Sequence, residues 1–80
     1  MTPEALLPLL RDVAQRAELE VRRPDGETSS AVCRIKGKLV VMVHAAEPAA
    51  KECELLVEAL KQVDLTGVFV PPAVREELDR

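Results

Sequence analysis

Apolar and polar positions change their spacing along the chain, and each change predicts a new element. Over residues 3–17 the apolar residues recur three and four positions apart, which is typical of a helix with one buried face. The residues on this face are Leu6, Leu10, Val13 and Ala17. Thr2 followed by Pro3 indicates where the helix starts. Because proline removes a backbone donor, Pro8 predicts a kink or a separate opening turn.

Between residues 18 and 44 the spacing becomes strand-like. We expect strands over residues 18–23, 31–35 and 39–43. Pro24, Asp25 and Gly26 supply turn chemistry before the second strand, and "KGK" lies between the second and the third. Together these segments predict a three-stranded antiparallel meander.

The turn around Gly37 allows two registers. A two-residue turn pairs Ile35 with Lys38, whereas a three-residue connection pairs Ile35 with Leu39. We favour the three-residue connection because it gathers six apolar residues on one face of the sheet. These residues are Ala31, Cys33, Ile35, Leu39, Val41 and Val43.

The opposite face of the predicted sheet is also rich in apolar residues. It carries Val32, Val40 and Met42 beside Arg34 and His44, which is too apolar for a surface that only water covers. The final segment of the chain offers few apolar residues that could cover it. We therefore expect a homodimer in which Val32, Val40 and Met42 form the interface.

A second amphipathic helix begins near Glu47 and Pro48. Its buried stripe is predicted from Ala49, Cys53, Leu56, Leu60 and Val63, and its charged face from Glu47, Lys51, Glu54, Glu58 and Lys61. "DLTG" at 64–67 ends this helix, and "PPAVREELDR" at 71–80 predicts a short final one. The expected fold is a two-layer α+β domain over residues 1–80: an N-terminal helix, the antiparallel meander, an amphipathic helix and a short C-terminal helix.

Composition narrows the possible functions. Eighty residues make one domain, and Phe69 is its one aromatic residue, so the chain lacks the stacking platforms of single-stranded nucleic-acid binders. No apolar stretch is long enough to span a bilayer and no signal peptide is indicated, so we expect a cytoplasmic protein. Cys33 and Cys53 lie in apolar patterns and are predicted to be reduced core residues.

Charge is distributed unevenly along the chain. The predicted sheet region carries an excess of basic residues, while the net charge of the whole chain is −3. A basic hairpin can bind phosphates, but lysines around a hairpin also keep a sheet edge soluble. The possible anion-binding residues are Arg22, Arg23, Arg34, Lys36 and Lys38.

The order of helix, three-stranded sheet and helix resembles the core of zincin-like metallopeptidases of the ImmA/IrrE type. In that family the helix after the sheet carries His-Glu-x-x-His, whose two histidines bind zinc and whose Glu is the general base. The comparable stretch here is "VEALK" at 57–61, in which Glu58 matches and Val57 and Lys61 replace the histidines. The resemblance therefore implies a peptide-binding scaffold without metal or catalytic residues.

A second resemblance involves the end of the chain. "DLTGVFVPPAVREEL", together with "CRIKGK" upstream, is similar to an uncharacterised group of short bacterial proteins with a Gly-Val-aromatic-x-Pro-Pro-Ala-Val-Arg ending. The resemblance implies that this ending docks as a structural unit.

The candidates for chemistry are few. His44 is the one histidine, and we expect it to bond to nearby backbone at the end of its strand. The favoured register places Cys33 on the other face, away from His44. We therefore predict a noncatalytic interaction or assembly module that self-associates and needs no cofactor. The alternatives are a binder of nucleic acid or of another anionic partner through the basic hairpin, and a degenerate zincin-like peptide-binding domain.

Overall fold

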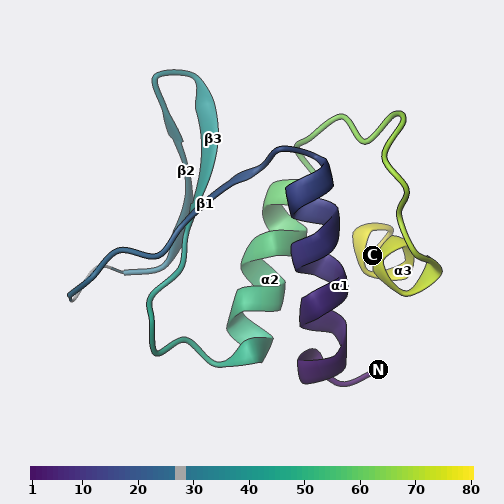
Figure 1. Ribbon diagram of the computed structural model, residues 1–80, viewed down its shortest axis with the longest axis horizontal. Helices are drawn as coiled ribbons and strands as arrows, with labels where there is room; N and C mark the ends of the chain where they lie inside the picture. Colours follow the sequence, from purple (N-terminus) through teal and green to yellow (C-terminus); the bar gives the residue numbers. More distant parts are fainter. Residues whose placement is uncertain (27–28) are drawn as a thin grey trace.

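Three helices and a three-stranded mixed sheet form the protein, as the computed structural model shows (Figure 1). The structure describes residues 1–26 and 29–80. The elements in chain order are α1 (Pro3–Arg16), β1 (Glu20–Arg22), β2 (Ala31–Ile35), β3 (Lys38–Met42), α2 (Ala49–Leu60) and α3 (Pro72–Leu78). Helices α1 and α2 lie side by side, with the sheet beyond α2 and α3 on the other side of the pair (Figure 1). The α+β class and all three predicted helices are confirmed.

Helix α1 begins where its sequence predicts. The hydroxyl of Thr2 accepts a hydrogen bond from the backbone N–H of Ala5 at 3.2 Å, which caps the helix. Pro8 lies inside a single continuous helix, so the separate opening turn is not formed. Leu10 and Val13 are fully buried on the face that the periodicity predicted.

The order of the strands differs from the predicted meander. The sheet order is β1-β3-β2, with β1 parallel to β3 and β2 antiparallel to it. The antiparallel meander is therefore wrong, because the third strand inserts between the first two. The physical reason lies in composition: β3 and the residue after it form the apolar run "LVVMV", which suits the central position, whereas the charged β1 takes an edge.

The favoured hairpin register is also wrong. Ile35 pairs with Lys38, so the connection is a two-residue turn. Lys36 and Gly37 have φ values of 53° and 81°, the left-handed conformation that a tight hairpin turn of this kind requires. In this register each residue of β2 lies on the face opposite to the predicted one. Val32 packs against the core, and Ala31, Cys33 and Ile35 lie on the outer face with Val40.

The core lies between the helices and one face of the sheet. It is built from aliphatic side chains, and Phe69 is 69% exposed. Val41 and Val43 contribute to it from β3 and the residue after β3, and Val74 contributes from α3. Because Val74 is fully buried against this core, the ending of the chain is docked rather than free. Among the helices of the described residues, none is long and apolar enough to cross a membrane.

Candidate functional site

A buried ion-pair cluster joins α1, the end of β1 and α2. Glu52 on α2 is only 3% exposed. Arg11 on α1 donates from Nε and Nη2 to the two carboxylate oxygens at 2.8 and 3.0 Å. Arg23, directly after β1, donates from Nη1 and Nη2 at 3.2 and 2.7 Å. Both guanidinium groups therefore bind one carboxylate in the two-pronged geometry that makes such pairs strong.

The two arginines keep Glu52 charged. Burial by itself would raise the pKa of this carboxyl group, but the hydrogen bonds and positive charges of Arg11 and Arg23 outweigh it and lower the pKa to about 2. The pKa of Arg11 is raised in turn, chiefly by its hydrogen bond to Glu52. A carboxylate that accepts four hydrogen bonds and stays ionised is poorly suited to take up a proton. The cluster is therefore better suited to holding α1, the end of β1 and α2 together than to acting as a general base.

A cavity of about 260 Å³ lies beside this cluster. Its apolar wall comes from α1, the start of the sheet and α2, and consists of Ala14, Leu19, Val21 and Leu56. Arg11, Gln15, Arg23 and Glu52 supply its polar groups. Two arginines and one glutamate line the cavity, so the net charge of its lining is +1.

Glu52 was not predicted to be a site residue. A signal was present, because positions 52, 56 and 59 are spaced by four and three and so lie on the buried face of α2. A charged residue within a buried stripe needs a partner of opposite charge. The partners could not be identified from spacing, since Arg11 and Arg23 come from two other segments of the chain.

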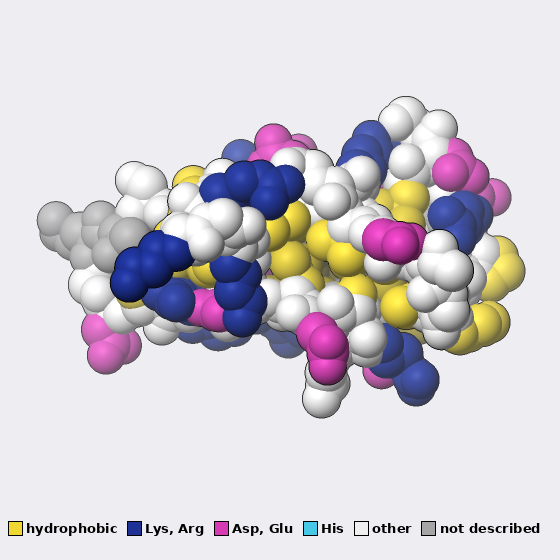
Figure 2. Space-filling view, turned by 90° about the horizontal axis from the view of Figure 1, so that it is seen from above, with side chains coloured by type: hydrophobic (Ala, Val, Ile, Leu, Met, Phe, Trp, Pro, Cys, Tyr) yellow, Lys and Arg dark blue, Asp and Glu magenta, His cyan; other side chains and the backbone are white. Residues whose placement is uncertain are grey.

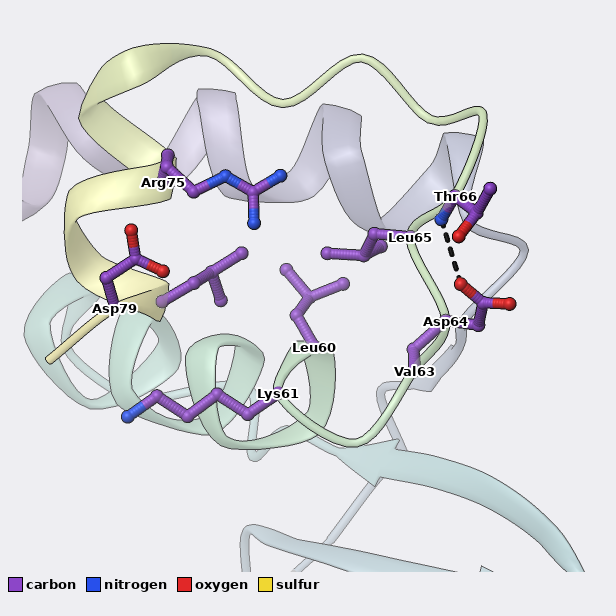
Figure 3. A pocket seen from close by; sticks show the side chains of 9 residues that line it. Leu60, Lys61, Val63, Asp64, Leu65, Thr66, Arg75 and Asp79 are labelled. Carbon is purple, nitrogen blue, oxygen red and sulfur yellow. Dashed lines mark hydrogen bonds between the residues drawn. The ribbon is translucent and has the colours of Figure 1, made fainter.

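A second cavity, of about 450 Å³, lies between the end of α2, the loop after it and α3 (Figure 3). Leu60 and Leu65 line it, and the guanidinium of Arg75 points into it from α3 (Figure 3). On its rim, Asp64 accepts a hydrogen bond from the backbone N–H of Thr66 at 2.9 Å. Hydrogen bonding from the side chain of Thr66, and then from its backbone, lowers the pKa of Asp64. No histidine or cysteine is among the residues that line this cavity.

The stretch compared with the zincin motif covers the end of α2 and Lys61, the residue after it. Glu58 is exposed, and Val57 and Lys61 occupy the positions of the two histidines. Over residues 1–26 and 29–80, no group of three or more His, Cys, Asp or Glu side chains is placed to hold a metal ion.

The predicted basic residues do not form one open surface. Lys38 pairs with Glu20 at 3.1 Å, and Arg22 pairs with the same carboxylate. These contacts lower the pKa of Glu20, with the hydrogen bond from Lys38 as the largest cause. Arg23 is held by Glu52. Basic side chains gather over the sheet end of the molecule with an acidic side chain among them (Figure 2), and within the described residues only Arg34 and Lys36 of the five form no ion pair.

His44 and Cys53 form hydrogen bonds with backbone groups of the chain. Nδ1 of His44 accepts a hydrogen bond from the backbone N–H of Ala46 at 3.0 Å, which confirms the expected bond to nearby backbone. Cys53 is buried and its thiol donates to the carbonyl of Pro3 at 3.5 Å; burial is the main cause that raises its pKa. Cys33 is half-buried on the sheet face that points away from the core, so the prediction of a core position is wrong for Cys33.

The predicted interface residues do not share one face. Val32 packs against the core, whereas Val40 and Met42 lie on the outer face of the sheet. Val40 is only 1% exposed because it lies in the central strand between Glu20 and Cys33, its partners on the neighbouring strands. Ile35, by contrast, is 38% exposed. The exposed apolar surface of the outer face is therefore concentrated on β2.

Comparison with known proteins adds no relative. No protein-family model matches the chain, and neither the curated proteins nor the solved structures contain a match.

Proposed function

We propose that this chain is a noncatalytic interaction module that self-associates through the β2 side of its sheet. The observation that carries the proposal is the position of β2, a five-residue strand at the edge of the sheet. An edge strand presents backbone N–H and C=O groups that no neighbouring strand satisfies, which makes it a template for pairing with another strand.

The two edges of the sheet differ in how well they are protected. β1 has three residues, and its Glu20 and Arg22 form ion pairs beside the outer face. Short length and charge are the devices that usually block edge pairing. β2 is longer and exposes Ile35, and among the described residues of the strand and its turn the charged ones are Arg34 and Lys36. β2 is therefore the less protected edge of the two.

This proposal keeps the homodimer expected from the sequence and moves its contact surface. Val40 is already buried in one subunit and Val32 faces the core, so a face-to-face contact would bury little further apolar area. Pairing at the β2 edge uses the exposed Ile35 and the backbone groups that bond to no other residue within 1–26 and 29–80.

The two alternatives have weaker support. Binding of nucleic acid through the hairpin would have to rely on Arg34 and Lys36, because the other predicted basic residues are held in ion pairs. A degenerate zincin-like domain would bind a peptide, and the β2 edge could also accept an extended peptide as an added strand. Self-association is favoured because a second copy supplies a strand of matching length.

The solution mass tests this proposal. We expect light scattering at about 100 μM to give twice the chain mass, and dilution below a micromolar dissociation constant to give the single chain. A single-chain mass at the higher concentration would overturn self-association. The peptide alternative would then be examined by binding of extended peptides to the same edge.

A further inference from the structure

The hairpin register determines which backbone groups of β2 point outward. In an antiparallel pair, residues alternate between positions that exchange both backbone hydrogen bonds and positions that exchange none. The two-residue turn makes Ile35 and Lys38 a bonded pair, so Cys33 with Val40 and Ala31 with Met42 are bonded as well. The N–H and C=O groups of Val32 and Arg34 therefore point to the open edge.

From this alternation we infer that two copies pair antiparallel along β2 in one register, in which Cys33 faces the partner's Cys33 on a twofold axis. The inference rests on the proposed self-association and adds its geometry. In this register Val32 pairs with the partner's Arg34, and Arg34 pairs with the partner's Val32. Each pair exchanges both backbone hydrogen bonds through groups that bond to no other residue in the described part of the chain.

Other registers are poorer. Only the register centred on Cys33 overlaps all five residues of β2 with all five of its copy. A register centred on Arg34 would place two guanidinium groups directly opposite each other, which is unfavourable. A register centred on Val32 would carry Arg34 past the end of the partner strand and leave its open groups opposite Ser30.

The side chains on the outer face also match in the register centred on Cys33. Ile35, a large apolar residue that is 38% exposed, falls opposite the partner's Ala31, and next to that alanine lies the partner's Met42. A row of Val40, Cys33 and their two copies then crosses the joined sheet. The contact therefore places the apolar side chains of the two outer faces beside one another across the joined edge.

This geometry makes a covalent test available. Cys33 and the partner's Cys33 would occupy a position without mutual backbone hydrogen bonds, where opposite Cα atoms are about 4.5 Å apart. This separation lies within the range that a disulfide bridges. When a diazene oxidant such as diamide is added, the two thiols lose two electrons and two protons, the sulfur atoms become bonded, and the oxidant is reduced to its hydrazine.

The experiment combines solution mass with oxidation by diamide at about 100 μM chain. We expect a covalent dimer on a non-reducing gel that dithiothreitol reverses. Cys33→Ser should abolish the covalent dimer while keeping the dimeric solution mass, and Cys53→Ser should leave both unchanged because Cys53 is buried.

Two further variants define the register. In a Cys33→Ser background, Ala31→Cys with Ile35→Cys should cross-link, whereas Ala31→Cys alone should not, because Ala31 faces the partner's Ile35. Arg34→Pro removes a backbone donor that points to the open edge. This variant should be folded by circular dichroism and should have the solution mass of a single chain. The matched control Arg34→Ala should remain dimeric.

The outcomes separate the two proposals. A dimeric mass without cross-linking through Cys33, or cross-linking by Ala31→Cys alone, overturns the register and leaves self-association standing. A single-chain mass overturns both.

Discussion

Glu52 remains charged in the interior because two half-exposed guanidinium groups reach it from α1 and from the end of β1. Buried ion pairs of this kind are costly to break and cheap to replace, since the desolvation cost of the charges offsets much of their attraction. Removing the two arginines should therefore destabilise the fold, whereas replacing all three residues of the cluster by apolar ones should cost little.

The first prediction concerns the partners of Glu52. Replacing both Arg11 and Arg23 by Met leaves a buried carboxylate without partners and should lower the free energy of unfolding by about 3 kcal/mol. Adding Glu52→Leu to these two replacements should bring the free energy of unfolding to within about 1 kcal/mol of that of the unmodified protein. Urea unfolding at pH 7 measures both values. Arg16→Met, which removes an exposed pair with Asp12, is the control and should change stability by under about 0.5 kcal/mol. An unchanged double variant would show that the cluster contributes nothing.

The second prediction is a pH dependence. The pKa of Glu52 is lowered from 4.5 to about 2 in the fold, so its stabilisation is complete above the unfolded value and is lost as pH falls through this interval. The loss amounts to roughly 3 kcal/mol, at about 1.4 kcal/mol per unit. Glu52→Gln should flatten unfolding free energies measured between pH 5 and pH 2, while Glu54→Gln, on the exposed side of α2, should keep the slope. Equal slopes in the two variants would assign the acid sensitivity to other groups.

At the scale of elements, the turn between β2 and β3 shows why the register was missed. The apolar pattern of β2 has Ala31, Cys33 and Ile35 at alternate positions, and this pattern favoured the wrong face. The turn residues Lys36 and Gly37 carried the better signal, because a two-residue turn with left-handed φ at both positions fits the twist of a hairpin. In a short edge strand, turn geometry outweighs a weak face preference.

The third prediction tests this turn. Gly37→Ala should lower the free energy of unfolding by about 1 to 2 kcal/mol, because a side chain is strained at its φ of 81°. Lys36→Asn should raise it by about 0.5 kcal/mol, since asparagine tolerates left-handed backbone. Lys36→Ala also removes the charge but lacks this tolerance, so it separates backbone conformation from electrostatics. Thermal unfolding measures all three variants, and a stabilised Lys36→Ala would contradict the backbone explanation.

At the scale of the whole molecule, the helices could be predicted because each has its own periodicity and start signal, as Thr2 and Leu10 show for α1. The strand order was missed because β1 and β3 pair across a long segment of chain, although the apolar run of β3 suits the central position. The same reason hid the cluster at Glu52. The strand order and the cluster at Glu52 were therefore missed because they depend on segments that meet only in three dimensions, whereas the signal for the hairpin register was local and was outweighed by the apolar pattern of β2.

The fourth prediction concerns the charge of the whole surface. Because Lys38 and Arg22 are paired with Glu20, we expect no micromolar binding to single- or double-stranded nucleic acid at about 150 mM salt. Fluorescence anisotropy with labelled oligonucleotides measures this. Salt-sensitive binding that disappears when Arg34, Lys36 and Lys38 are replaced by Gln would favour the basic-hairpin alternative.

The insertion of β3 between β1 and β2 also sets an order of folding events. The β2–β3 hairpin closes through a two-residue turn, so it can form from neighbouring residues alone, whereas Val21 has no strand to join until Val41 is in place. The hairpin is therefore expected to be structured in the folding transition state and β1 to be added after it. Changes in the turn should then act mainly on the folding rate, and changes in β1 mainly on the unfolding rate.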